Sequence, residues 1–172
     1  MPMIRKARTG CWRAAVLSLL LWPAPAAADT ALGTETQLPL PRFVSLRSNE
    51  INLRTGPGIN YPVEWVYHRR GMPVEVVAEY DSWRKIRDWQ GTEGWVHQSM
   101  LDGRRGALIV GGERILRREP MAGAAGVARL EPGVIVQLKE CGAGWCRLES
   151  GGYDGWLQRD EFWGAYPGES VE

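Results

Sequence analysis

The chain has 172 residues, of which 24% are charged, and a formal net charge of +1 at pH 7. Its first 28 residues hold four basic residues and no acidic one, so the chain without them carries a formal charge of −3. A mildly acidic chain lacks the concentrated basic face that nucleic-acid binding requires, which argues against a nucleic-acid partner.

Residues 1–28 have the features of a secretory signal peptide. Basic residues up to Arg13 precede a nine-residue apolar stretch over 14–22, and Ala26-Ala27-Ala28 supplies the small residues for cleavage before Asp29. The alternative is a membrane anchor, but a spanning helix needs about 20 apolar residues. We therefore expect a cleaved signal and a periplasmic or secreted protein with no stable membrane span after cleavage.

The segments at the two ends of the remaining chain show no apolar periodicity. Residues 29–42 contain prolines at positions 39 and 41, and we predict a flexible spacer there. Residues 164–172 are predicted to form a short polar tail.

Short strands are expected between residues 43 and 103. Glycine and proline recur too often there to leave room for a long amphipathic helix. The expected strands lie at 44–46, 51–53, 63–67, 73–80, 83–87 and 94–97, with a single helical turn over 96–101. Several short strands with turn residues between them, in about 60 residues, predict a small barrel or sandwich.

The same pattern occurs a second time in the chain. Matching residues lie 61 to 63 positions apart: Leu53-Arg54 and Leu116-Arg117, Gly71 and Gly133, Trp83 and Trp145, Ile86 and Leu148, Gly94-Trp95-Val96 and Gly155-Trp156-Leu157. This period is longer than the 20–50 residues of a solenoid unit. The sequence therefore predicts an all-β protein with two tandem small domains, residues 43–103 and 107–163.

Two cysteines remain after removal of the signal, which contains Cys11. Cys141 and Cys146 flank Gly142-Ala143-Gly144-Trp145, a sequence typical of a tight hairpin turn. An even cysteine count in an oxidising compartment favours a structural disulfide. The alternatives are weaker: a zinc site lacks a nearby histidine, and the C-x4-C spacing differs from that of the redox C-x-x-C motif.

The segment Leu53-Arg54-Thr55-Gly56-Pro57-Gly58 resembles the opening motif of bacterial SH3 (Src-homology 3-like) domains. In that family a glycine with alternating hydrophobic residues, a W-x-x-hydrophobic motif and a G-W-V motif follow. This chain has Gly71-Met72-Pro73-Val74, Trp83-Arg84-Lys85-Ile86 and Gly94-Trp95-Val96. The resemblance covers about 43–103 well and about 107–163 more loosely. It implies two small open β-barrels, a location in the cell envelope, and binding of peptidoglycan or a peptide.

The first unit has seven tyrosines and tryptophans, more than a barrel of about 60 residues buries, so we expect some of them at the surface. The ligand-binding candidates are Tyr61, Trp65, Tyr67, Trp83 and Arg54. Alternation along its strand places Trp83 on the face opposite Ile86, where it covers an edge or lines a groove. Arg54 either braces its loop, the favoured role, or meets a ligand carboxylate. Alternatively, the aromatics cover an interface between the two domains.

Catalysis is not supported by the sequence. The two histidines, His68 and His97, lie 29 positions apart, and no nucleophile, base and orienting group stand out. We expect no metal and no cofactor. The favoured function is an exported, non-catalytic binding module that recognises peptidoglycan or a peptide through an aromatic groove on the first barrel. The alternative is a scaffold that binds another envelope protein and no glycan.

Overall fold

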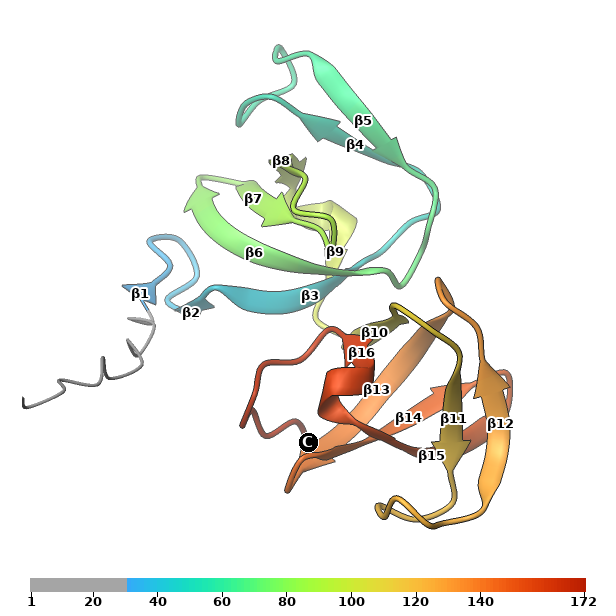
Figure 1. The fold of residues 1–172 in the computed structure, drawn as a ribbon. Helices are drawn as coiled ribbons and strands as arrows, with labels where there is room; N and C mark the ends of the chain where they lie inside the picture. The colour runs from blue at the N-terminus through green and yellow to red at the C-terminus, as the bar shows by residue number, and fades with distance from the viewer. Residues whose placement is uncertain (1–30) are drawn as a thin grey trace, which may run out of the picture.

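The computed structural model describes residues 31–172, so the expected signal peptide over 1–28 lies outside the described residues. Nearly all regular structure in the described part is β-strand (Figure 1). Two seven-stranded antiparallel sheets follow one another along the chain, and each encloses its own core. The prediction of an all-β protein with two tandem small barrels is confirmed. Within residues 31–172 no helix is long and apolar enough to cross a membrane.

The first barrel contains the strands β3 to β9, and its sheet has the order β5-β4-β8-β7-β6-β3-β9. A short 3-10 turn, η1, precedes the last strand. The bounds are β3 (Arg42–Leu46), β4 (Ile51–Arg54), β5 (Val63–Tyr67), β6 (Pro73–Tyr80), β7 (Trp83–Arg87), β8 (Glu93–His97), η1 (Gln98–Met100) and β9 (Leu101–Asp102).

The second barrel repeats this arrangement, with the sheet order β12-β11-β15-β14-β13-β10-β16. Its 3-10 turn, η2, stands at the place that corresponds to η1, as the sequence predicts. The bounds are β10 (Gly106–Ile109), β11 (Arg114–Arg117), β12 (Gly126–Leu130), β13 (Ile135–Gly142), β14 (Trp145–Ser150), β15 (Tyr153–Gln158), η2 (Arg159–Glu161) and β16 (Phe162–Trp163).

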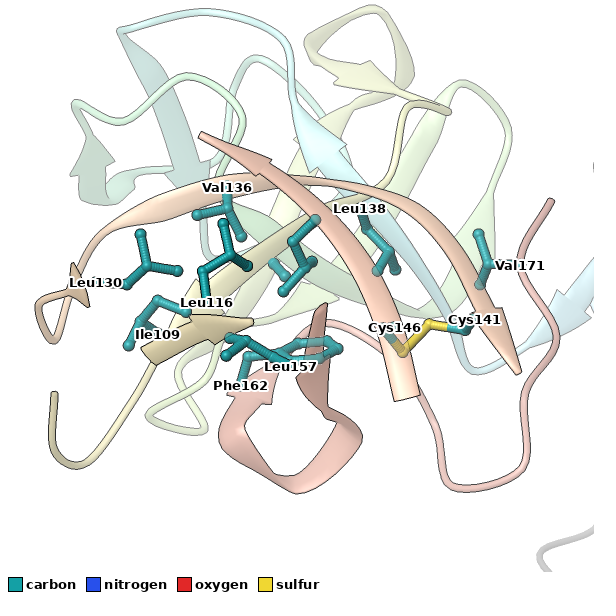
Figure 2. Close-up of a cluster of buried hydrophobic side chains, with 12 residues drawn as sticks. Ile109, Leu116, Leu130, Val136, Leu138, Cys141, Cys146, Leu157, Phe162 and Val171 are labelled. Atoms are coloured by element: carbon teal, nitrogen blue, oxygen red, sulfur yellow. A yellow bond between two sulfur atoms is a disulfide. The ribbon is translucent and has the colours of Figure 1, made fainter. Parts of the chain in front are cut away.

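Alternating apolar residues on the strands build the two cores. In β4 the buried residues are Ile51 and Leu53, which stand two positions apart and so point to the same face. In the second barrel Leu116, Leu138 and Leu157 belong to one cluster of buried hydrophobic side chains (Figure 2). Each core is small, because a domain of about 60 residues buries only about 60% of its unfolded surface.

Each barrel has a cross-strand pair of side chains at the same position of its corresponding hairpin, a disulfide in one barrel and an ion pair in the other. In the second barrel Cys141 faces Cys146 across β13 and β14, and their sulfur atoms are bonded at 2.08 Å, which confirms the predicted disulfide. In the first barrel Glu79 faces Arg84 across β6 and β7, 62 positions earlier. There the carboxylate Oε1 lies 3.6 Å from the Arg84 Nε.

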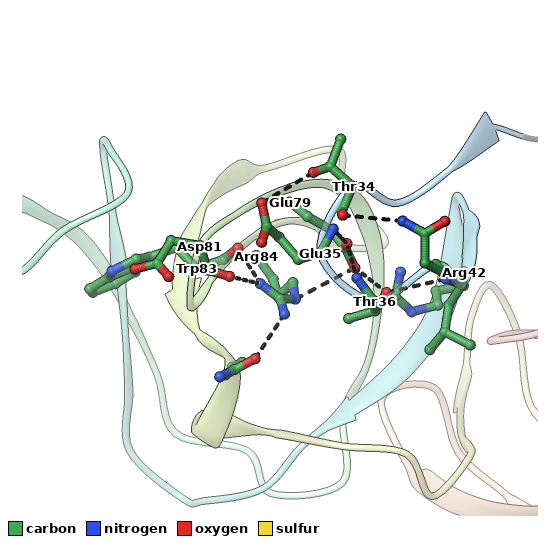
Figure 3. Close-up of polar contacts among 11 residues, drawn as sticks. Thr34, Glu35, Thr36, Arg42, Glu79, Asp81, Trp83 and Arg84 are labelled. Atoms are coloured by element: carbon green, nitrogen blue, oxygen red, sulfur yellow. Dashed lines mark hydrogen bonds and ion pairs between the residues drawn. The ribbon is translucent and has the colours of Figure 1, made fainter.

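The prediction of a flexible spacer over 29–42 is wrong for residues 31–42. Strands β1 (Ala31–Leu32) and β2 (Pro39–Leu40) pair as a hairpin, and β3 begins at Arg42. The Glu79 carboxylate holds the hairpin turn: its Oε2 accepts from the backbone N–H groups of Glu35 (3.0 Å) and Thr36 (2.9 Å), and its Oε1 accepts from the Thr36 hydroxyl (2.6 Å) (Figure 3). Because polar contacts hold this hairpin, its sequence shows no apolar periodicity from which the strands could be predicted.

The segment 164–172, expected to be a free polar tail, is likewise packed on the protein. Val171 is buried, and its carbonyl accepts from the backbone N–H of Cys141 at 2.9 Å. The Glu169 carboxylate pairs with Arg105 at 2.6 Å. Each barrel therefore uses its β6–β7 or β13–β14 hairpin to hold a terminal segment of the chain.

The two barrels are in direct contact, and three residues, 103–105, connect β9 to β10. Phe43 of the first barrel packs edge-on against Trp163 of the second, with 4.8 Å between ring centroids. The Tyr166 hydroxyl donates to the Glu75 carboxylate across the interface at 2.9 Å. The aromatics that cover this interface therefore come from β3, β16 and the C-terminal segment.

Candidate functional site

The β4–β5 hairpin projects from the first barrel (Figure 1). Its loop and β5 carry four exposed apolar side chains. We call this set the hairpin patch, and it consists of Ile59 (77% exposed), Tyr61 (47%), Val63 (43%) and Trp65 (57%). Four large apolar residues within seven positions, all facing solvent, form a feature that marks interaction surfaces in soluble proteins.

Arg54 holds the loop of the hairpin patch in place. Its Nη1 donates to the carbonyl oxygens of Ile59 at 3.1 Å and Tyr61 at 2.7 Å. The bracing role that the sequence favours for Arg54 is therefore the one its contacts show. Because an arginine presents several donors in a rigid fork, one side chain can fix two carbonyl groups and keep the loop in a single conformation.

A close contact between Gly56 and the Tyr61 ring also fixes the loop. A Cβ at Gly56 would lie 2.3 Å from the ring Cδ1, so only glycine permits this contact. The backbone N–H of Thr55 donates to the Pro62 carbonyl at 3.1 Å and closes the loop. The patch is thus preorganised, which lowers the entropic cost of binding.

Tyr67 lies inside the barrel, although the sequence groups it with the surface candidates. Its side chain is 5% exposed, and its hydroxyl donates to the Asp88 Oδ2 at 2.9 Å. Burial, with the Asp88 charge and the hydrogen bond to it, raises the pKa of Tyr67. The other Asp88 oxygen accepts from the backbone N–H groups of Gln90 and Thr92, each at 2.9 Å. Tyr67 therefore fixes the β7–β8 turn and does not line an open surface.

Trp83 is also buried, at 9% exposure, which corrects the expectation that it lines a groove. Its ring packs edge-on against His97, its partner across β7 and β8, with 5.5 Å between ring centroids. Of the four aromatic candidates, only Tyr61 and Trp65 are exposed at the surface. The exposed aromatic residues therefore lie on a projecting hairpin and not in the groove that we expected from the sequence.

A family model described as the bacterial SH3 domain matches residues 47–103 and 110–164 of the chain. The chain belongs to the bacterial SH3 domain family. The first match covers β4 to β9 and the second β11 to β16, so each leaves out only the first strand of its barrel. The hairpin patch lies in the first match. A comparison with curated protein sequences finds no match.

The two bacterial SH3 barrels are also similar to parts of solved structures. NlpC2 from Trichomonas vaginalis matches at 15% identity and a TM-score of 0.33 over 74% of this chain and 48% of that protein. An NlpC/P60 family protein from Bacillus cereus matches at 14% identity and a TM-score of 0.33 over 70% of this chain and 55% of that protein. The chain thus spans about half the length of these proteins.

The β4–β5 pair of the bacterial SH3 hairpin contains a β-bulge next to the hairpin patch. In the β4–β5 pair, Leu53 faces Trp65 and Arg54 faces Val63, so Glu64 is the extra residue of the bulge. A bulge changes the direction of side chains and increases the local twist. Trp65 and Tyr67 lie on the same side of this bulge, in regular register opposite Leu53 and Ile51, so alternation gives them the same face; Trp65 is nevertheless 57% exposed and Tyr67 5%. Ile59 and Val63 are aliphatic, so the aromatic pattern of the sequence does not single them out.

The two histidines of the bacterial SH3 barrels lie in different surroundings. His97 caps the η1 turn, with its Nδ1 2.7 Å from the Ser99 hydroxyl oxygen and 3.3 Å from the Ser99 backbone nitrogen. His68 is exposed in the turn that follows β5. Among residues 31–172 no group of three or more His, Cys, Asp or Glu side chains is placed to hold a metal ion.

Proposed function

We propose that this protein is an exported, non-catalytic binding module that attaches to the cell wall through the hairpin patch. Bacterial SH3 domains are commonly cell-wall binding modules, and the chain belongs to that family. The Cys141–Cys146 disulfide supports a location outside the cytoplasm, because disulfides persist in oxidising compartments.

The observation that carries the proposal is the rigid, exposed hairpin patch. Tyr61 and Trp65 offer ring faces on which a sugar or an extended peptide can pack, and such rings lose little conformational entropy on binding. Because Arg54 and Gly56 fix the loop before any ligand arrives, the patch is complete in the free protein. We propose peptidoglycan, through its sugars or its peptides, as the ligand.

A second candidate function is a scaffold that binds an envelope protein. One observation favours it: β5 ends the first sheet, so its outer edge has backbone groups to which an added strand can pair. Cross-linking in cells followed by purification would identify such a partner. Two results together would establish this alternative: the unmodified chain does not bind sacculi, and it captures a single partner protein that the Val63→Pro variant fails to capture.

Co-sedimentation with purified peptidoglycan sacculi tests the main proposal. The protein is expected in the pellet, and Trp65→Ala is expected to leave most of it in solution. The matched control is Tyr153→Ala, which removes an equally exposed aromatic (57%) from the second barrel and should not change the pelleted fraction. Equal pelleting of the protein and of Trp65→Ala would refute the assignment to the hairpin patch.

A further inference from the structure

A cavity of about 220 Å³ lies at the junction of the two barrels. It is distinct from the hairpin patch and forms only where the barrels meet, because both barrels and the linker contribute to its wall. The first barrel contributes Ser45, Leu46, Arg70, Gly71 and Asp102, the linker Arg104 and Arg105, and the second barrel Gly106, Ile135, Val136 and Gln137. At about 30 Å³ per water molecule, this volume corresponds to about seven water-sized groups.

Two buried donors at this cavity have no hydrogen-bond partner. Ser45 is 3% exposed, and its hydroxyl makes no hydrogen bond within the described chain. The Nε of Arg105 is also buried and unpaired, while its Nη1 donates to Glu169 and its Nη2 to the Gly164 carbonyl. Buried polar groups in native proteins are nearly always paired, with protein or with ordered water, so two unpaired donors on residues that line one cavity indicate that an acceptor atom of water or of a ligand occupies it.

The charges around the cavity leave one arginine without an acidic partner. Arg104 lies 3.9 Å from Asp102, and Arg105 is paired with Glu169 at 2.6 Å. Arg70 lines the cavity, and no carboxylate oxygen within residues 31–172 lies within 4.0 Å of it. Three arginines and one aspartate line the cavity, and Glu169 pairs with Arg105 from outside the lining. The one remaining positive charge, that of Arg70, suits a ligand with one negative charge.

The remaining lining residues indicate the shape of that ligand. Leu46, Ile135 and Val136 form apolar wall, on which a short aliphatic group can pack. The Gln137 carbonyl oxygen accepts from the Lys139 ammonium at 3.0 Å, so its amide N–H groups remain as donors. A ligand with one negative charge and an aliphatic group next to it matches a carboxylic acid better than inorganic phosphate, which has no aliphatic group.

We propose that the junction cavity binds the carboxylate of a small aliphatic acid or of a peptide C-terminus. Arg70 supplies the compensating charge, and the Ser45 hydroxyl and the Arg105 Nε donate to the carboxylate oxygens. Charge-assisted hydrogen bonds of this kind are the strong ones in proteins. The site is independent of the hairpin patch, so its failure and that of the wall-binding proposal can be observed separately.

Titration of the 15N-labelled protein, followed by NMR, tests this proposal. The probes are N-acetyl-alanyl-alanine, the same compound as its C-terminal amide, acetate, and inorganic phosphate. We expect the two carboxylates to shift the backbone amide signals of Arg70, Gly71 and Gly106 saturably, and the amide probe to leave them in place. Tighter binding of the dipeptide than of acetate would identify a peptide C-terminus as the source; equal binding would identify a small organic acid.

Two variants and one control locate the site. Arg70→Gln should weaken carboxylate binding at least about tenfold, as expected for the loss of a hydrogen bond to a charged group. Ser45→Ala should weaken it severalfold without unfolding the protein, because the change removes only an unpaired buried hydroxyl. Arg118→Gln, an exposed arginine outside the cavity lining, should leave binding unchanged. Equal binding of acid and amide, binding of phosphate alone, no saturable shift, or unchanged binding by Arg70→Gln would each overturn the proposal.

Discussion

The buried carboxylate of Glu79 permits a quantitative prediction. Its side chain is fully buried, and besides the hairpin turn it binds Arg42, whose guanidinium donates at 2.8 Å. Burial by itself would raise the pKa of Glu79, but the hydrogen bonds from Thr36, Arg42 and the Glu35 backbone outweigh it and lower the pKa from 4.5 to about 2. The charged form is therefore the one that stabilises the fold.

This lowered pKa converts into a stability difference that depends on pH. At about 1.4 kcal/mol for each pH unit, the fall from 4.5 to about 2 corresponds to about 3 kcal/mol. Because the folded-state pKa lies below the unfolded-state value, this stabilisation is complete above pH 4.5. It is lost as the pH falls from 4.5 through about 2.

Glu79→Gln tests this reasoning. At pH 7 we expect the free energy of unfolding to fall by about 3 kcal/mol, because Arg42 and Arg84 lose their shared carboxylate. The assay is urea unfolding, for the protein and the variant, at several pH values between 7 and 2.5. The difference between the two should be constant above pH 5 and should shrink steadily below it.

The matched control for this prediction is Glu35→Gln, which neutralises an exposed carboxylate in the same hairpin. It should change the free energy of unfolding by no more than about 0.5 kcal/mol, as is usual for surface substitutions. A Glu79→Gln difference under about 1 kcal/mol, or one that does not change between pH 7 and 2.5, would refute the account of the buried carboxylate.

Three further predictions concern the barrels and their contact. Reduction of the Cys141–Cys146 disulfide opens the short loop that the bond closes, so it should lower the free energy of unfolding by about 2 kcal/mol. Denaturation with and without reductant measures this difference, and no change would contradict the loop-entropy argument. Gly106→Ala places a Cβ 2.2 Å from the Gly71 carbonyl oxygen, so it should lower the free energy of unfolding by about 1–3 kcal/mol and enlarge the radius of gyration in X-ray scattering. An unchanged radius would show that the clash is relieved without moving the barrels apart. Trp83→Ala should destabilise the first barrel by about 3–5 kcal/mol in thermal or urea unfolding, and an unchanged stability would argue against its burial.

The strands and the disulfide could be predicted from the sequence because each depends on a local pattern. Alternation of apolar residues over 63–67, 73–80 and 83–87 gives the observed strand bounds, and the short turn between Cys141 and Cys146 places the two cysteines opposite each other on neighbouring strands. The 61- to 63-residue repeat then gives the second barrel, even where its motifs differ from those of the first.

The terminal segments could not be predicted, because contacts distant in the sequence order them. Glu79 holds the turn at Thr36, which lies 43 positions earlier, and Arg105 holds Glu169, 64 positions later. The candidate site was half predicted for a related reason. Tyr61 and Trp65 are exposed as expected, but alternation gives Trp65 and Tyr67 the same face and does not show that only Tyr67 is buried.

The most direct test of the central claim is to map the binding surface with soluble peptidoglycan fragments. In NMR titrations of the 15N-labelled protein, we predict that amide shifts concentrate in residues 59–65 and that Trp65→Ala abolishes them while the rest of the spectrum stays folded. Fragments that shift only signals outside 59–65, or that bind Trp65→Ala as tightly as the unmodified protein, would contradict the claim that the hairpin patch attaches this protein to the cell wall.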